Sequence, residues 1–198
     1  MPKNITGDLL ALSRRPPTPD QYRAALSGLR PHAVRGAAVI AAAQLDFALF
    51  VALISKLKPL SREDMYIFEN DGPYATTAQK IDACYSLGII GPKSKKETKT
   101  INRVRNAFSH ATANVTFGTD AIEAAIRSLN TMELFPEFSD TRQYRRSDFL
   151  WRTTKDRYVT SIKIYCEKLL KYYEEMRRPA TIIKNGIASM RWTPEPLP

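Results

Sequence analysis

The chain has 198 residues, enough for one domain of ordinary size. Its 43% hydrophobic and 25% charged residues are typical of a globular protein and exclude disordered, collagen-like and low-complexity classes. The formal net charge of +10 favours an acidic partner, either nucleic acid or an acidic protein surface. Two cysteines and two histidines exclude a disulfide scaffold and leave little material for a metal site. We therefore expect a reduced, cytoplasmic protein without metal or cofactor.

The first elements are predicted from prolines and one long apolar run. Residues 1–31 form a proline-bearing arm with one short helix, which begins after Thr18 and ends near Arg30. The next helix spans about 33–57 and is apolar enough to suggest a membrane span, but Gln44 and Asp46 lie in its middle. We expect a buried helix in a soluble bundle, with Asp46 paired to Arg35 on the same helix.

Capping signals set most of the remaining boundaries. Ser61 opens a short helix through Phe68, and Thr76 with Gln79 opens the following helix, which ends at Gly88. Ser94 and Glu97 are expected to open a helix that covers about 95–110. A shorter helix follows from about 119 to 129, then a long loop with Pro136, and a last helix over 154–177.

These elements predict an all-α fold, a single helical bundle of about six or seven helices. Residues 1–31 form the arm, 32–178 the helical domain, and 179–198 a C-terminal tail. The prolines of residues 193–198 exclude regular structure there. Cys84 and Cys166 are expected to be buried small hydrophobic residues.

The segment from Arg105 to His110 is the sharpest local feature, because an arginine precedes a histidine by four intervening residues. It resembles the signature of the HEPN superfamily. This resemblance implies a metal-independent ribonuclease, with Arg105 and His110 facing RNA in a composite site across a dimer. The chemistry fits, since histidine transfers protons near neutral pH, arginine stabilises phosphorane charge, and Asn106 can orient either group.

A structural interpretation of the same segment stays open. Residues five apart on an ideal helix point about 140° away from one another, so Arg105 and His110 converge only at an unwound helix end or across a dimer. In the alternative, Arg105 pairs with an acidic residue of the bundle, Asn106 and Ser109 cap or bridge, and His110 ends the helix.

A wider resemblance covers roughly Arg35 to Ile122. The order and spacing of several segments are similar to the mannitol operon repressor family: residues 35–38, 44–46, 68–73, 81–90, 105–110 and 116–120. The resemblance implies an all-helical regulator that has no helix-turn-helix and acts through protein partners.

Basic residues could extend either function. Lys95, Lys96, Lys99 and Arg103 line one helix, and the cluster Arg142, Arg145 and Arg146 lies in the long loop; together they could bind nucleic acid or an acidic partner, or form a solvated surface. Three hypotheses follow: a homodimeric regulator acting through a protein partner, a metal-independent endoribonuclease, and a nucleic-acid binding module that does not cleave.

Overall fold

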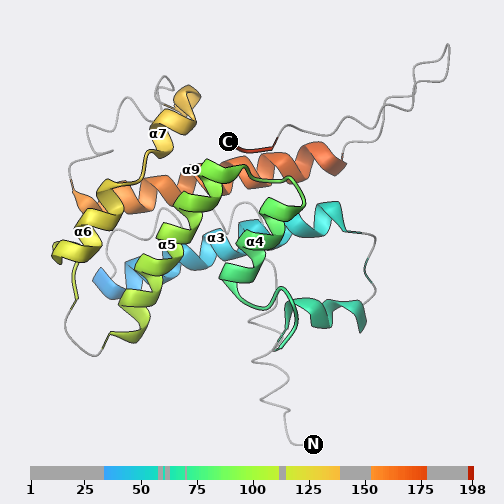
Figure 1. Cartoon of the computed structure of the whole chain (residues 1–198), viewed down its shortest axis with the longest axis horizontal. Coiled ribbons are helices and arrows are strands. Elements are labelled where there is room, and N and C mark those ends of the chain that lie inside the picture. Colours follow the sequence, from blue (N-terminus) through green and yellow to red (C-terminus); the bar gives the residue numbers. More distant parts are fainter. Residues whose placement is uncertain are drawn as a thin grey trace, which may run out of the picture.

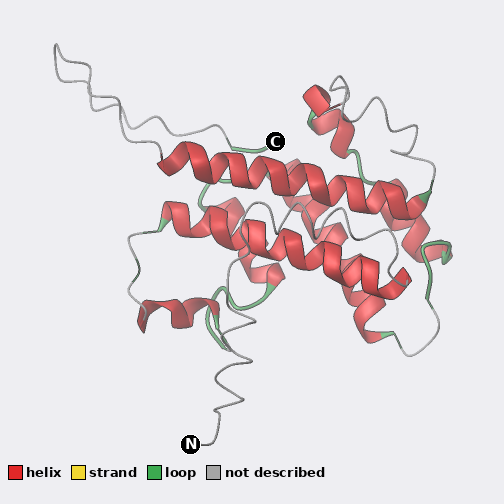
Figure 2. Cartoon of the chain, turned by 180° about the vertical axis from the view of Figure 1, so that it is seen from behind, coloured by secondary structure: helices red, strands yellow, loops and turns green. Residues whose placement is uncertain are grey.

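The structure is a computed structural model that describes residues 34–57, 60, 63–69, 71–111, 115–138, 153–177 and 196–198. Within these residues every regular element is helical, which confirms the all-α prediction (Figure 2). The elements are α3 (Val34–Lys56), the 3₁₀ helix η1 (Glu63–Phe68), α4 (Thr77–Ser86), α5 (Pro92–His110), α6 (Asp120–Arg127), α7 (Thr131–Leu134), the 3₁₀ helix η2 (Pro136–Phe138) and α9 (Thr154–Arg177). The short helix predicted between Thr18 and Arg30 and most of the predicted C-terminal tail lie outside the described residues.

Helices α3 and α9 form the centre of the domain. They lie side by side and run in the same direction, and α5 crosses them (Figure 1). The alanines of α3 are fully buried at several positions, including Ala38 and Ala48, whereas α9 buries large side chains such as Tyr158 and Tyr165. Large residues of one helix facing small residues of another allow close backbone approach, which explains the alanine content of α3.

The apolar character of α3 reflects its place in this core. The helix is long and apolar enough to cross a membrane, with a mean hydropathy of 2.2 in an 18-residue window. However, 56% of that window is buried inside the domain. The helix packs against α9, α4 and α5. The predicted 33–57 helix is confirmed to within one residue at each end, and its burial is that of a core helix.

Helix α4 begins as predicted. The backbone N–H of Gln79 donates to Thr76 Oγ1 at 3.3 Å, and the backbone N–H of Thr76 donates to Gln79 Oε1 at 2.9 Å. This is a complete capping box. Gly88 follows the helix with a φ of 66°, a conformation that glycine adopts without the steric cost of a Cβ.

The predicted start of α5 is wrong. The helix begins at Pro92, with Gly91 as the N-cap residue and no capping side chain, so Ser94 lies inside the first turn. Proline is favoured at the first helical position because its fixed φ suits the helix and it has no N–H to leave unpaired. Ser94 and Glu97 therefore form no capping box, and both are buried.

The second half of the chain is also more helical than predicted. After α6, the expected loop contains α7 and η2, anchored by buried Leu129, Thr131 and Phe135. Helix α9 has the predicted bounds, from Thr154 to Arg177. Its buried face repeats at helical spacing, which is why sequence periodicity located it correctly.

Candidate functional site

Helix α5 carries the predicted catalytic residues, and it continues unbroken to His110. Arg105 is half-buried and donates from a guanidinium nitrogen to Asn106 Oδ1 at 2.9 Å, whereas His110 is exposed. Because the helix does not unwind between them, Arg105 and His110 point about 140° apart. One chain therefore brings Arg105 and Asn106 together and leaves His110 on a different side of the helix.

The structural interpretation of this segment is confirmed only in part. Helix α5 does end at His110, but Arg105 bonds to an amide and not to an acidic residue of the bundle. The buried Ser109 hydroxyl has no hydrogen-bond partner among the described residues, so it bridges nothing there. A second guanidinium reaches this end of α5, because Arg35 donates to the carbonyl oxygen of Ala111 at 3.1 Å. Cations favour the carbonyl end of a helix.

The basic residues of α5 are partly neutralised by helix α4. Asp82 lies 2.9 Å from the Lys95 ammonium and 2.8 Å from the Lys99 ammonium. Hydrogen bonds from Lys99 and Lys95 hold the pKa of the Asp82 carboxyl below its usual value. Lys96 and Arg103 are exposed and make no ion pair within the described residues. The predicted loop cluster Arg142, Arg145 and Arg146 lies outside the described residues.

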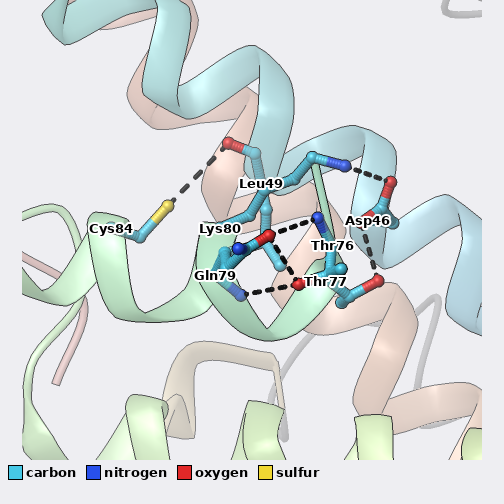
Figure 3. Close-up of polar contacts among 7 residues, drawn as sticks. All are labelled: Asp46, Leu49, Thr76, Thr77, Gln79, Lys80 and Cys84. Carbon is cyan, nitrogen blue, oxygen red and sulfur yellow. Dashed lines mark hydrogen bonds and ion pairs between the residues drawn. The ribbon is translucent and has the colours of Figure 1, made fainter. Parts of the chain in front are cut away.

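Asp46 has a different partner from the predicted one. Its carboxylate lies 2.7 Å from the Lys80 ammonium and accepts from Thr77 Oγ1 at 2.7 Å, which joins α3 to α4 (Figure 3). The predicted pair with Arg35 is wrong, because the two residues are separated by about 16 Å along the helix axis. Arg35 turns instead to the end of α5.

Glu97 is a buried carboxylate, only 6% exposed. One oxygen accepts from the backbone N–H of Asn130, and the other accepts from Thr131 Oγ1 at 2.6 Å and from the Tyr165 hydroxyl at 3.0 Å. Glu97 thus supplies acceptors to the start of α7 and to α9. Three donors account for its burial, so its role is structural.

Both cysteines are buried, as predicted, and neither forms a disulfide within the described residues. Burial raises the pKa of the Cys84 thiol well above its ordinary value, and its sulfur lies 3.8 Å from the carbonyl oxygen of Leu49 (Figure 3). A thiol in this setting is a poor nucleophile. Among the described residues, no three His, Cys, Asp or Glu side chains are grouped to hold a metal ion.

Sequence reasoning missed a groove beside the start of α5. Residues Pro196–Pro198 lie in this groove, where Leu197 forms a parallel β-bridge with Ile90. Leu197 is 6% exposed and belongs to the hydrophobic core. We call this contact surface the Leu197 groove; it comprises residues 89–91, the first turn of α5 and the α9 residues that line the pocket beside Pro196–Pro198. The signals for it were a helix start without a capping side chain and a leucine between two prolines.

Comparisons with family models, with curated proteins and with solved structures find no match for this chain.

Proposed function

We propose that this protein is a cytoplasmic, homodimeric regulator that acts through a protein partner. The resemblance of residues 35–122 to the mannitol operon repressor family is the starting point, with a bundle of about six or seven helices as its fold. The observation that carries the proposal is that cations of the predicted nucleic-acid site are engaged within the chain. Lys95 and Lys99 share Asp82.

These contacts disfavour a phosphate-binding surface. A nucleic acid that used Lys95 and Lys99 would have to compete with Asp82, whose negative charge lies under 3 Å from both ammonium groups. It would also approach Asp82 itself, and like charges repel. The Leu197 groove, in contrast, already holds a stretch of polypeptide by main-chain hydrogen bonds. Recognition of protein therefore suits this surface better than recognition of RNA.

The test combines an RNA assay with a search for a partner. We expect micromolar protein to leave mixed RNA intact in EDTA and to show no binding that weakens steeply between 50 and 200 mM salt. Nuclease-treated extract passed over the immobilised full chain should still yield a protein partner in stoichiometric amount. Salt-dependent binding of RNA without cleavage, and no protein partner, would instead establish the non-cleaving nucleic-acid module.

A metal-independent ribonuclease is the second candidate function. The observation that favours it is the environment of the Arg105 guanidinium. This guanidinium is half-buried, and within the described residues it faces an amide instead of a carboxylate, so its positive charge is not neutralised by an ion pair. In this hypothesis Arg105 stabilises phosphate charge, His110 of the second subunit transfers the proton, and Asn106 orients the arginine.

Mixing two inactive variants tests this candidate directly. If the site is composite, Arg105→Ala and His110→Ala homodimers are both inactive, but a heterodimer keeps one site with both residues intact. Cleavage should then return on subunit exchange, to about half of the wild-type rate per heterodimer. Wild-type protein that does not cleave, with circular dichroism showing intact helices, would eliminate the ribonuclease.

A further inference from the structure

The Leu197 groove binds its occupant mainly through the backbone. The Leu197 N–H donates to the carbonyl oxygen of Ile89 at 3.0 Å, and the Gly91 N–H donates to the carbonyl oxygen of Leu197. The Ser94 N–H donates to the Pro198 main-chain oxygen at 2.6 Å. The contacts therefore require one N–H, two consecutive main-chain oxygens and one apolar side chain from the bound segment.

The occupant's sequence matches these requirements. Only Leu197 has to donate a backbone N–H, so the two flanking prolines lose nothing by lacking one. Prolines also hold the segment extended before it binds, which lowers the entropy lost on docking. Leu197 supplies the buried side chain.

Gly91 allows the backbone of the bound segment to lie close to the wall of the groove. A Cβ at this position would lie 2.9 Å from the carbonyl oxygen of Leu197 and 2.9 Å from the carbonyl carbon of Pro198, too close without movement of the backbone. The N-terminus of α5 has no capping side chain, so the bound segment supplies acceptors to two of its backbone donors. An empty groove would leave both donors to water.

A pocket lies beside the occupant of the groove. It has a volume of about 440 Å3, and its walls are formed by Pro196–Pro198 together with Phe135, Glu137, Lys168, Lys171, Tyr172 and Glu175. The Lys168 ammonium is paired with Glu137 and lies 5.3 Å from the centre of the Phe135 ring. This wall is aromatic with balanced charge, so it accommodates further residues of an extended peptide.

We propose that the Leu197 groove is the partner-binding site, and that it accepts an extended peptide of the partner with a leucine-like side chain flanked by prolines. Residues Pro196–Pro198 are then an intramolecular competitor that keeps the site closed until the partner displaces them. The proposal rests on the proposed function as a regulator with a protein partner. A segment tethered to its own site has an effective concentration in the millimolar range, so it competes strongly with a free peptide.

The experiment measures binding of a labelled peptide with the sequence of residues 191–198 to the full chain, by fluorescence anisotropy. Leu197→Asp in the full chain should remove the competitor and lower the Kd of the peptide at least about tenfold relative to wild type. Leu87→Asp is the matched control, because Leu87 is 38% exposed and contributes to no groove contact, and it should bind as wild type does. A peptide with aspartate at the leucine position should not bind.

A second substitution locates the binding. Gly91→Val added to Leu197→Asp should abolish peptide binding, since the new side chain occupies the space of the peptide backbone. Equal peptide affinity of wild type and Leu197→Asp, or unchanged binding after Gly91→Val, would overturn the proposal.

Hydrogen exchange covers the case in which Leu197→Asp does not fold. In wild type, the Gly91 and Ser94 amides should exchange by local opening, faster than by global unfolding, and saturating peptide should change their rates. Exchange at these amides through global unfolding alone would contradict the proposal. If the peptide binds but no protein partner is recovered, only the proposed function is overturned. If a protein partner binds equally well to wild type and to the Gly91→Val, Leu197→Asp double variant, only the assignment of the groove as the partner-binding site is overturned.

Discussion

At the residue scale, Glu97 shows how this domain accommodates a buried charge. Its carboxylate accepts from Asn130 and Thr131 at the start of α7 and from Tyr165 on α9. Burying an ionised carboxylate is costly unless its oxygens are hydrogen-bonded, and here both oxygens have donors. Replacing such a residue lowers the stability of the fold through its hydrogen bonds, because its loss leaves several donors unpaired at once.

We expect Glu97→Leu to lower the free energy of unfolding by about 3 kcal/mol, because it leaves three donors without an acceptor. Glu97→Gln keeps one carbonyl oxygen and an amide that can donate to a hydroxyl, so its cost should be about 1 kcal/mol. Urea unfolding midpoints measure both changes. Equal costs for the two variants would show that the carboxylate's hydrogen bonds contribute little.

Arg105 illustrates how the local environment changes the meaning of a short motif. The resemblance of the segment from Arg105 to His110 to the HEPN signature implies a ribonuclease site. The unbroken helix α5 makes the two side chains point about 140° apart, and the Arg105 guanidinium donates to the Asn106 amide oxygen. In the ribonuclease hypothesis, the two residues can therefore form one site only with the help of a second subunit. The mixed-variant assay described above measures this dependence directly.

At the element scale, the packing of α3 on α9 depends on small residues. Ala48 is fully buried on α3, and Ala43 on the same helix is exposed. Alanine and leucine have nearly equal helix propensity, so the two positions separate packing from helix formation.

Ala48→Leu should lower the free energy of unfolding by about 2 kcal/mol, because the added methylenes have no space in a close-packed interface. Ala43→Leu should change it by less than about 0.5 kcal/mol. Thermal or urea unfolding of the two variants provides the comparison. A tolerated Ala48→Leu, with stability equal to that of Ala43→Leu, would mean that α3 is not tightly packed against its neighbours.

Across the whole domain, three buried tyrosines lie along one face of α9, and two of them bond to other helices. The Tyr158 hydroxyl lies 3.4 Å from the Ala38 carbonyl oxygen and 3.3 Å from that of Ile101, so it reaches both α3 and α5. Tyr165 reaches Glu97, and Tyr172 is buried further along the same face. Burial raises the pKa of all three phenols, that of Tyr172 to about 12.

Stability should therefore fall in alkaline solution. A phenol with a pKa above its unfolded value of about 10 keeps its proton in the folded state, so its stabilising contribution is complete below pH 10 and is lost as the pH rises towards the folded pKa. Each tyrosine contributes a slope of up to about 1.4 kcal/mol per pH unit. Urea unfolding between pH 8 and 11 measures this slope. Tyr172→Phe should reduce the dependence of the unfolding free energy on pH by the contribution of one phenol. An unchanged pH dependence would contradict the raised pKa of Tyr172.

Elements whose signals are local could be predicted without the fold. Helix α3, the capping box of Thr76 and Gln79, the glycine end of α4 and the bounds of α9 follow from periodicity and from residues within a few positions of each other. The end of α5 at His110 was also predicted. Such signals act through backbone geometry and neighbouring side chains, so they need no knowledge of the fold.

The contacts between distant residues, in contrast, follow from how the helices pack. Asp46 pairs with Lys80 instead of Arg35, Glu97 accepts from residues at the start of α7 instead of capping its own helix, and Leu197 lies beside Ile90. These contacts join residues that are distant in the chain, and several donors or cations compete for each acceptor. The choice among them depends on which helices pack together, since a buried polar group is satisfied by whatever partner the packing brings within reach.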